Sequence, residues 1–127
     1  MHGKREDIPL VAQSGSSFYR RDAEWGDMMV AFVAFPAGTD SAGLFRGLPN
    51  DSCQCPHWGY LLKGRMRVRY ADHEEVVTAG EAYHMAPGHN VLMEEDCAVV
   101  EFSPKGEDYQ KMWEVAGRNM AAMQRGG

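Results

Sequence analysis

The chain has 127 residues, which is enough for one domain with one hydrophobic core. Hydrophobic residues make up 44% and charged residues 24% of the sequence, both close to globular averages, so wholesale disorder is excluded. The formal net charge of -5 leaves no basic excess to neutralise phosphates, which argues against a nucleic-acid partner. No apolar run reaches the roughly 18 residues of a membrane span, so we expect no membrane partner.

The N-terminus and the cysteines bear on the compartment. The first ten residues, MHGKREDIPL, lack the apolar stretch of a secretory signal. The three cysteines are an odd number, and two of them are the near neighbours Cys53 and Cys55. Residues two apart rarely form an unstrained disulfide, so free or metal-bound thiolates in a reducing compartment fit better. We therefore expect a cytoplasmic protein.

The first half of the chain predicts short strands and long connectors. Residues 1–16 are polar and predict an arm or a first edge strand. Residues 18–20 and 28–35 are typical of strands, and the polar stretch 21–27 is predicted to separate them. Residues 36–43 and 44–52 are rich in turn residues and predict two connectors.

From residue 53 to residue 104, short strands and turns follow in quick succession. Residues 61–70 alternate, with Lys63, Arg65, Arg67 and Arg69 on one face and Leu62, Met66, Val68 and Tyr70 on the other. Residues 71–74 predict a hairpin turn, and residues 97–102 a closing strand. Strands at this spacing predict an all-β sandwich or barrel.

The last segment has a different periodicity. Residues 107–123 predict an α-helix, because its apolar side chains recur at helical spacing. These apolar positions are Tyr109, Met112, Trp113, Ala116, Met120 and Met123. The helix is predicted either to pack on the outside of the β-structure or to form a dimer contact, and we expect a homodimer.

Two segments resemble the core motifs of the cupin superfamily. The first is an apolar strand that runs into a glycine, Tyr60-Leu61-Leu62-Lys63-Gly64. The second runs from Gly80-Glu81 to the corner Ala86-Pro87-Gly88-His89. The resemblance covers about residues 45–104. It implies that residues 1–127 form a small single-domain bacterial cupin, a jelly-roll β-barrel with its site inside the barrel and with a C-terminal helix.

The ligand positions depart from the usual cupin pattern of two histidines and a glutamate, with a third histidine in the second motif. Alignment on the first motif gives Asp51, Cys53 and His57, and the second-motif position falls on Val91. None of the four positions has the residue that the pattern expects there, which argues against the standard iron or manganese dioxygenase chemistry. The chain instead resembles a bacterial subgroup with a His-x-Gly-Tyr strand start, at residues 57–60, and a Pro-Gly-His corner, at residues 87–89.

The residues themselves still predict a metal site. Cys53, Cys55 and His57 occur at every second position, so in one extended strand they would share a face. With His89 they offer two sulfurs and two nitrogens, or a three-ligand subset with an open position, which zinc prefers and iron also accepts. We therefore expect a divalent metal ion, zinc or iron, at Cys53, His57, His89 and Cys55, with the two histidines as the first candidates.

Further residues are assigned supporting roles near this site. Asp51 and Glu101 are predicted as oxygen ligands or as partners that orient an imidazole. His84 is interpreted as a pocket residue and not as a ligand.

Two features oppose the metal site. Pro56 lies inside the proposed strand, which indicates an edge, a bulge or a turn. His57 also has the same odd numbering as the outward Arg65 and Arg67, so a bulge at Gly59 or Gly64 is required. The alternative is that the cysteines and histidines are buried core groups without a metal.

Three classes of function fit these observations, all with a small organic molecule as the substrate or ligand. In the first, a metal ion acts with His57 and His89 as a Lewis acid or activates water or dioxygen, with isomerase, dioxygenase, hydrolase and lyase reactions all open. The second is a metal-free or structural-metal cupin that binds or senses a small molecule. The third is a metal-free enzyme in which His57 or His89 is an acid/base catalyst. The sequence contains no motif for a serine nucleophile, a phosphate loop or a dinucleotide.

Overall fold

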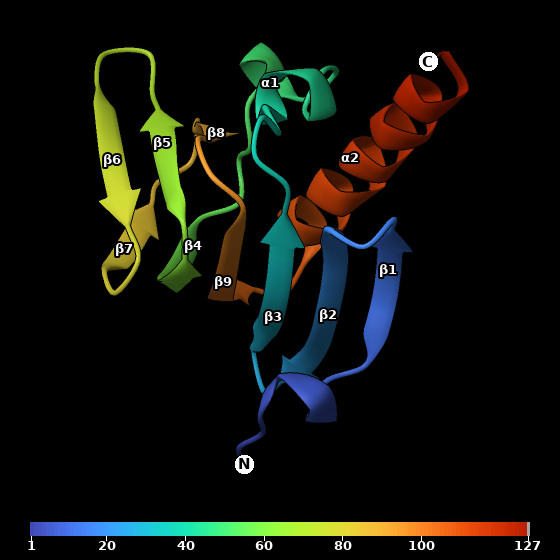
Figure 1. The fold of residues 1–127 in the computed structure, drawn as a ribbon, viewed down its shortest axis with the longest axis vertical. Coiled ribbons are helices and arrows are strands. Elements are labelled where there is room, and N and C mark those ends of the chain that lie inside the picture. The colour runs from blue at the N-terminus through green and yellow to red at the C-terminus, as the bar shows by residue number, and fades with distance from the viewer. Residues whose placement is uncertain (127) are drawn as a thin grey trace.

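The structure is a computed structural model that describes residues 1–126, and its strands form two antiparallel sheets (Figure 1). The larger sheet has the order β1 (Leu10–Ser14), β2 (Phe18–Trp25), β3 (Met28–Phe35), β9 (Cys97–Pro104), β4 (His57–Lys63) and β7 (Ala82–Met85). The smaller sheet has the order β6 (Glu74–Thr78), β5 (Arg65–Arg69) and β8 (Asn90–Met93). The helical elements are η1 (Arg5–Asp7), α1 (Ser41–Leu44), η2 (Pro49–Asp51) and α2 (Glu107–Gly126).

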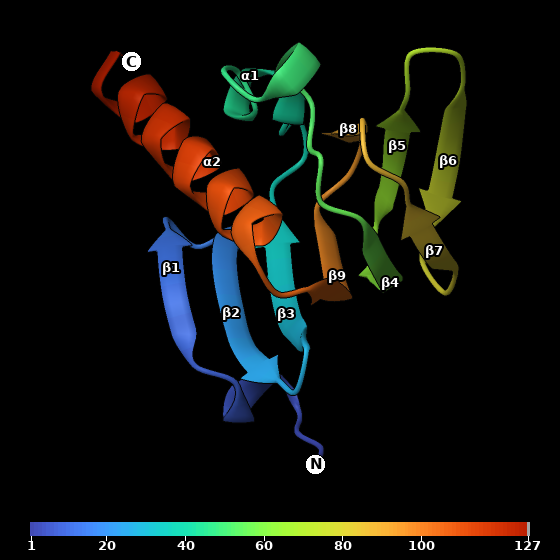
Figure 2. The same cartoon turned by 180° about the vertical axis from the view of Figure 1, so that it is seen from behind.

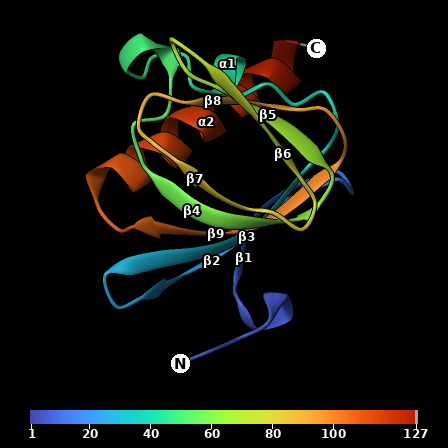
Figure 3. The same cartoon turned by 90° about the vertical axis from the view of Figure 1, so that its left-hand side faces the viewer.

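The two sheets curve around a common interior, as the view along the barrel shows (Figure 3). The larger sheet contributes buried Leu61 and Val99, and the smaller one contributes buried Met66 and Val68. Burial of apolar side chains from both sheets is the main stabilising contribution to such a structure. The predicted all-β barrel with a C-terminal helix is therefore confirmed.

Strand β2 is longer than the sequence predicted. The polar stretch 21–27 does not separate two strands, because residues 21–25 continue β2 in register with β3, and only Gly26 and Asp27 turn the chain. The polar side chains are tolerated because they have partners, such as the ion pair of Arg20 and Asp22 at 3.0 Å. Strand β1 pairs with β2 alone, which agrees with the predicted edge strand.

The junction of β4 and β5 resolves the problem of the alternation. Along β4, His57 and Leu61 face the interior, and the register against β9 shifts between Leu61 and Lys63. Gly64 then adopts a φ of +95°, and the chain passes into the smaller sheet with Met66 inward. The predicted shift of the alternation is confirmed, but the register changes between Leu61 and Lys63, just before Gly64 and not at it. Leu62, predicted on the same face as Met66, is instead 48% exposed because the register shift falls at this position.

Helix α2 crosses the sheet at strands β1 to β3 (Figure 2). It buries Tyr109, Met112, Val115 and Ala116 against the rest of the chain. The Tyr109 hydroxyl donates a hydrogen bond of 2.8 Å to Asp22 on β2, and Arg20 lies over the Trp113 ring. The apolar stripe of the helix is therefore used within the chain, in agreement with the predicted packing on the β-structure. Among the described residues, no helix has the length and apolar character required to cross a membrane.

Gly64 and Gly88 provide a matched test of the irregularity after β4. Both have nearly the same φ, +95° and +94°, so alanine should cost about 1–3 kcal/mol of backbone strain at either position. A Cβ at Gly64 would also lie 2.3 Å from the Asp96 carbonyl oxygen, whereas none of the described atoms lies within 4 Å of a Cβ at Gly88. We expect Gly64→Ala to lower the free energy of unfolding, measured by urea denaturation, by at least about 1 kcal/mol more than Gly88→Ala. Equal losses would contradict this close approach.

Candidate metal centre

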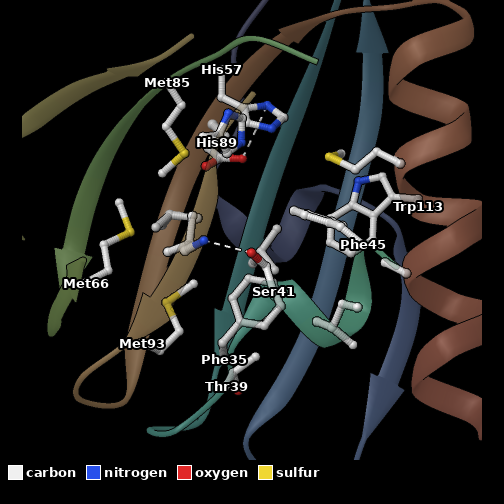
Figure 4. Close-up of a pocket in the computed structure, with 17 residues that line it drawn as sticks. Phe35, Thr39, Ser41, Phe45, His57, Met66, Met85, His89, Met93 and Trp113 are labelled. Carbon is white, nitrogen blue, oxygen red and sulfur yellow. Dashed lines mark hydrogen bonds and ion pairs between the residues drawn. The ribbon is translucent and has the colours of Figure 1, made fainter. Parts of the chain in front are cut away.

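Three potential ligands converge inside the barrel. His57 is the first residue of β4, His89 ends the turn between β7 and β8, and Cys53 lies in the connector before β4. Their ligand atoms all lie within 4.8 Å of one another, and each residue is buried. Figure 4 shows His57 and His89 together at one end of a pocket. Their ring centroids are 5.1 Å apart and the rings meet edge to face, at 70°. The two leading candidates from the sequence therefore share one site.

A backbone bridge brings Cys53 to His89. The Cys53 amide donates to the His89 carbonyl at 2.9 Å, and the Gly88 amide donates to the Cys53 carbonyl at 2.7 Å. This isolated antiparallel bridge connects the long connector to the Pro-Gly-His corner. Cys53 therefore reaches the site by pairing with that corner and not as part of strand β4.

His89 has one ring nitrogen free to bind a cation. Its Nδ1 lies 2.7 Å from the Ala86 carbonyl oxygen, which can only accept, so Nδ1 carries the proton. The other nitrogen, Nε2, therefore has an available lone pair. Burial lowers the pKa of His89 to about 4, with a further contribution from His57, so the ring is neutral at neutral pH. A neutral imidazole held by a backbone carbonyl is the usual state of a histidine ligand.

His57 has a similar arrangement on β9. Its Nδ1 lies 2.7 Å from the Ser103 hydroxyl and 3.8 Å from a carboxylate oxygen of Glu101. Its Nε2 lies 3.6 Å from the Cys53 sulfur. These contacts fix the ring with Nε2 toward Cys53, so Glu101 and Ser103 orient this imidazole.

Tyr83 in turn positions Glu101. Its hydroxyl donates to the second carboxylate oxygen of Glu101 at 2.5 Å. The end of the Tyr83 ring lies over Gly59, where a Cβ would come within 2.5 Å of it. Gly59 is therefore required by the space that Tyr83 occupies, since its own φ is not positive.

The third group, the Cys53 thiol, is surrounded by weak partners. Burial raises its pKa well above the ordinary value, so it is protonated at neutral pH in the absence of a cation. The thiol lies 3.2 Å from the Met112 sulfur and 3.5 Å from the Cys55 carbonyl oxygen. A metal ion displaces such a proton, because thiolate is the ligand form. Two imidazoles and one thiolate fit zinc and other ions that prefer nitrogen and sulfur donors.

Cys55 lies outside this group of three. It is buried, but its sulfur contacts the Pro56 carbonyl oxygen at 3.6 Å, and burial raises its pKa to about 12. The predicted strand that would place Cys53, Cys55 and His57 on one face is wrong, because β4 begins only at His57. Pro56 was the sequence signal against that strand.

Of the three residues that were assigned supporting roles, Asp51, His84 and Glu101, only Glu101 lies at the site. Asp51 is exposed in η2 and accepts a hydrogen bond from the Gly47 amide, so it lies away from the site. The interpretation of His84 as a pocket residue is wrong: it is exposed and stacks on Trp58 with ring centroids 4.8 Å apart. Alternation along β7 explains this, because Tyr83 and Met85 point inward. Glu101 has the predicted orienting position.

A small apolar cavity lies next to the two histidines (Figure 4). Its volume is about 70 Å³, which is room for a few waters or one small molecule. Aromatic and methionine side chains dominate its wall: Phe35, Phe45, Met66, Met85, Met93, Met112 and Trp113. The potential ligands therefore border an apolar space that a small organic molecule could enter.

Comparison with known proteins identifies the fold. The sequence matches no known family profile, and no curated protein matches it. A solved RmlC-like cupin from Shewanella frigidimarina aligns with 84% of this chain and 93% of its own, at 16% identity and a TM-score of 0.59. The chain has a cupin fold. The jelly-roll cupin barrel that the two sequence motifs implied is therefore confirmed.

Other cupin structures agree. KdgF from a Halomonas species aligns with 84% of this chain and 94% of its own, at 18% identity and a TM-score of 0.54. An oxalate decarboxylase variant from Bacillus subtilis aligns with 83% of this chain but only 31% of its own, at 14% identity and a TM-score of 0.56. At these identities the comparisons establish the cupin fold.

The hydrogen bond from Ser103 allows a test of the site. We expect Ser103→Ala to weaken metal binding by about 10- to 100-fold, because His57 loses the partner that orients its ring. The measurement is competition with a chelator for zinc. Ser52→Ala is the matched control, since Ser52 is also buried beside Cys53 but bonds the Pro49 carbonyl. Similar affinities in both variants would show that Ser103 has no part in the site.

Proposed function

We propose that this cupin holds a metal ion with Cys53, His57 and His89 and binds a small organic molecule in the adjacent cavity. The convergence of one sulfur and two imidazoles within 4.8 Å, all buried, is the observation that carries this proposal. Burial of three such groups in one place has a structural cost that a common ligand offsets. The cysteine in the donor set favours zinc over iron, because thiolate is a soft ligand.

The chemistry of the proposed site depends on the number of ligands. Three protein donors leave one position free in the four-coordinate geometry that zinc prefers. A metal ion with a free position polarises a bound oxygen atom or lowers the pKa of bound water. The chain itself supplies the orientation of His57 through Ser103 and Glu101, and the apolar wall excludes bulk water. Isomerase, hydrolase and lyase reactions on a small molecule are compatible with this arrangement.

Metal content tests the proposed site directly. Untagged protein loaded with zinc under reducing conditions is expected to hold close to one ion per chain by elemental mass spectrometry. Cys53→Ser and His57→Ala should lose most of this metal. Cys55→Ser is the matched control, because Cys55 is equally buried but lies outside the group, and it should keep the metal.

A different result would favour another class of function. If the wild-type protein binds no metal ion when it is offered zinc, iron and Cu(I) in turn, the metal proposal fails. That result would favour a metal-free cupin that binds a small molecule, or a metal-free enzyme in which His57 or His89 transfers a proton. A ligand that raises the melting temperature without turnover identifies the binding protein.

The homodimer predicted from the sequence remains a prediction, and the larger sheet offers a surface for it. Its outer face exposes Trp58, Tyr60, Leu62 and Phe102 by 37–48% each, and Trp58 pairs directly with Phe102. Exposed apolar side chains grouped on one face are typical of interfaces. We expect Leu62→Glu to convert a dimer to a monomer in sedimentation analysis, and Val76→Glu, an exposed apolar position on the other sheet, to leave it intact. A monomeric wild-type protein would refute the prediction.

A further inference from the structure

Met112 lies against the proposed metal site from a different part of the fold. It comes from helix α2, it is 5% exposed, and its Sδ lies 3.2 Å from Sγ of Cys53. The cavity has three other buried methionines, and these come from β5, β7 and β8: Met66, Met85 and Met93. Among the contacts of the described residues, the sulfur-to-sulfur contact with Cys53 is made by Met112 alone. Its thioether is therefore in direct contact with one of the three potential ligands and lines the same cavity as the two histidines.

The helix holds this side chain in place from both sides. Tyr109, one turn before Met112, is bonded to Asp22, and Trp113, the next residue, packs under Arg20. Further along the helix, the side-chain amide of Asn119 donates hydrogen bonds to the Leu44 and Arg46 carbonyl oxygens, at 2.8 and 3.0 Å. The backbone of α2 is thus fixed against the sheet and against the connector after α1. The methionine itself keeps three rotatable bonds, so its sulfur can adjust to an ion.

We propose that Met112 is a fourth donor and that the site binds copper in its monovalent form, Cu(I). This inference rests on the proposed metal site at Cys53, His57 and His89. The complete set for Cu(I) is then two imidazole nitrogens, one thiolate and one thioether, so the position that three donors leave free on zinc is filled by Met112 in the copper form. Thioether sulfur is a soft, uncharged donor that suits Cu(I), whereas the protein ligands of zinc are thiolate, imidazole and carboxylate.

The close contact of the two sulfurs has a simple chemical meaning. In the metal-free protein, the Cys53 thiol proton has three acceptors within reach: the Met112 sulfur at 3.2 Å, the Cys55 carbonyl oxygen at 3.5 Å and His57 Nε2 at 3.6 Å. When Cu(I) binds, that proton leaves to solvent, a copper–thiolate bond forms, and the thioether lone pair is released toward the ion. No electron is transferred in this step, and the oxidation state of copper is unchanged.

Charge alone does not select the ion. Cu(I) with one thiolate is electrically neutral, which lowers the cost of burial in an apolar wall. A divalent ion with the same thiolate retains one positive charge, but the Glu101 carboxylate, 3.8 Å from the His57 ring, offsets part of that cost. The thioether of Met112 is therefore the feature that distinguishes copper from zinc.

The experiment compares two metals across matched methionine variants. Cu(I) affinity is measured without oxygen by competition with a coloured Cu(I) chelator, and zinc affinity by competition with a zinc chelator. We expect Met112→Leu to weaken Cu(I) binding by at least about ten-fold and to change zinc binding by less than about three-fold. Met66→Leu makes the same chemical change in the same cavity but away from Cys53, and should leave both affinities within about three-fold.

A second measurement does not depend on a variant that could repack. Copper-edge X-ray absorption of the Cu(I)-loaded wild-type protein should show two sulfur and two nitrogen neighbours. The same spectrum from Cys55→Ser excludes Cys55 as the second sulfur. An unchanged Cu(I) affinity in Met112→Leu, or a single sulfur neighbour, would overturn the role of Met112 and leave the three-residue metal site standing. A protein that binds zinc but not Cu(I) would overturn the copper inference alone, whereas a protein that binds neither ion would overturn both proposals.

Discussion

The candidate site depends on one short backbone pairing, the antiparallel bridge between Cys53 and His89. Its two hydrogen bonds, at 2.9 and 2.7 Å, join the connector before β4 to the corner between β7 and β8. Strand β4 then starts four residues after Cys53 and places His57 on the inner face of the barrel. Without this bridge, the thiol and the His89 ring would belong to two unrelated loops. The site therefore forms because the connector before β4 pairs with the Pro-Gly-His corner.

The sequence predicted the barrel because its two motifs carry backbone requirements as well as apolar pattern. Gly64 and Gly88 both adopt positive φ values; Gly64 ends the first of the two segments that define the resemblance, and Gly88 lies in the corner at the end of the second. The apolar stripe of residues 107–123 likewise predicted helix α2. His57 and His89 could be paired in advance because each motif places one of them at a fixed distance from its glycine.

Other features of the structure could not be predicted from local sequence patterns. The polar stretch 21–25 belongs to a strand because Asp22 meets Tyr109 of α2, 87 residues further along the chain. Periodicity cannot detect a partner so distant. His84 has bulky neighbours on both sides, so alternation gave no preference for its outward position. Ser103 and Tyr83 support His57 only through pairing among β4, β7 and β9, although the alternation of Glu101 and Ser103 on one strand was a usable signal. Met112 looked like an ordinary core residue of the helix stripe.

The Tyr83–Glu101–His57 chain shows how a residue without a side chain can shape chemistry. Gly59 lies beneath the Tyr83 ring, and that ring fixes the carboxylate that faces His57. Any larger residue at position 59 would push on the tyrosine and, through it, on the imidazole. The bridge between Cys53 and His89 also affects how the chain opens. Cys53, His57 and His89 come from the connector, β4 and the β7–β8 corner. An ion bound by all three would stabilise the folded chain by its binding free energy and would tie the opening of these three segments into one cooperative event.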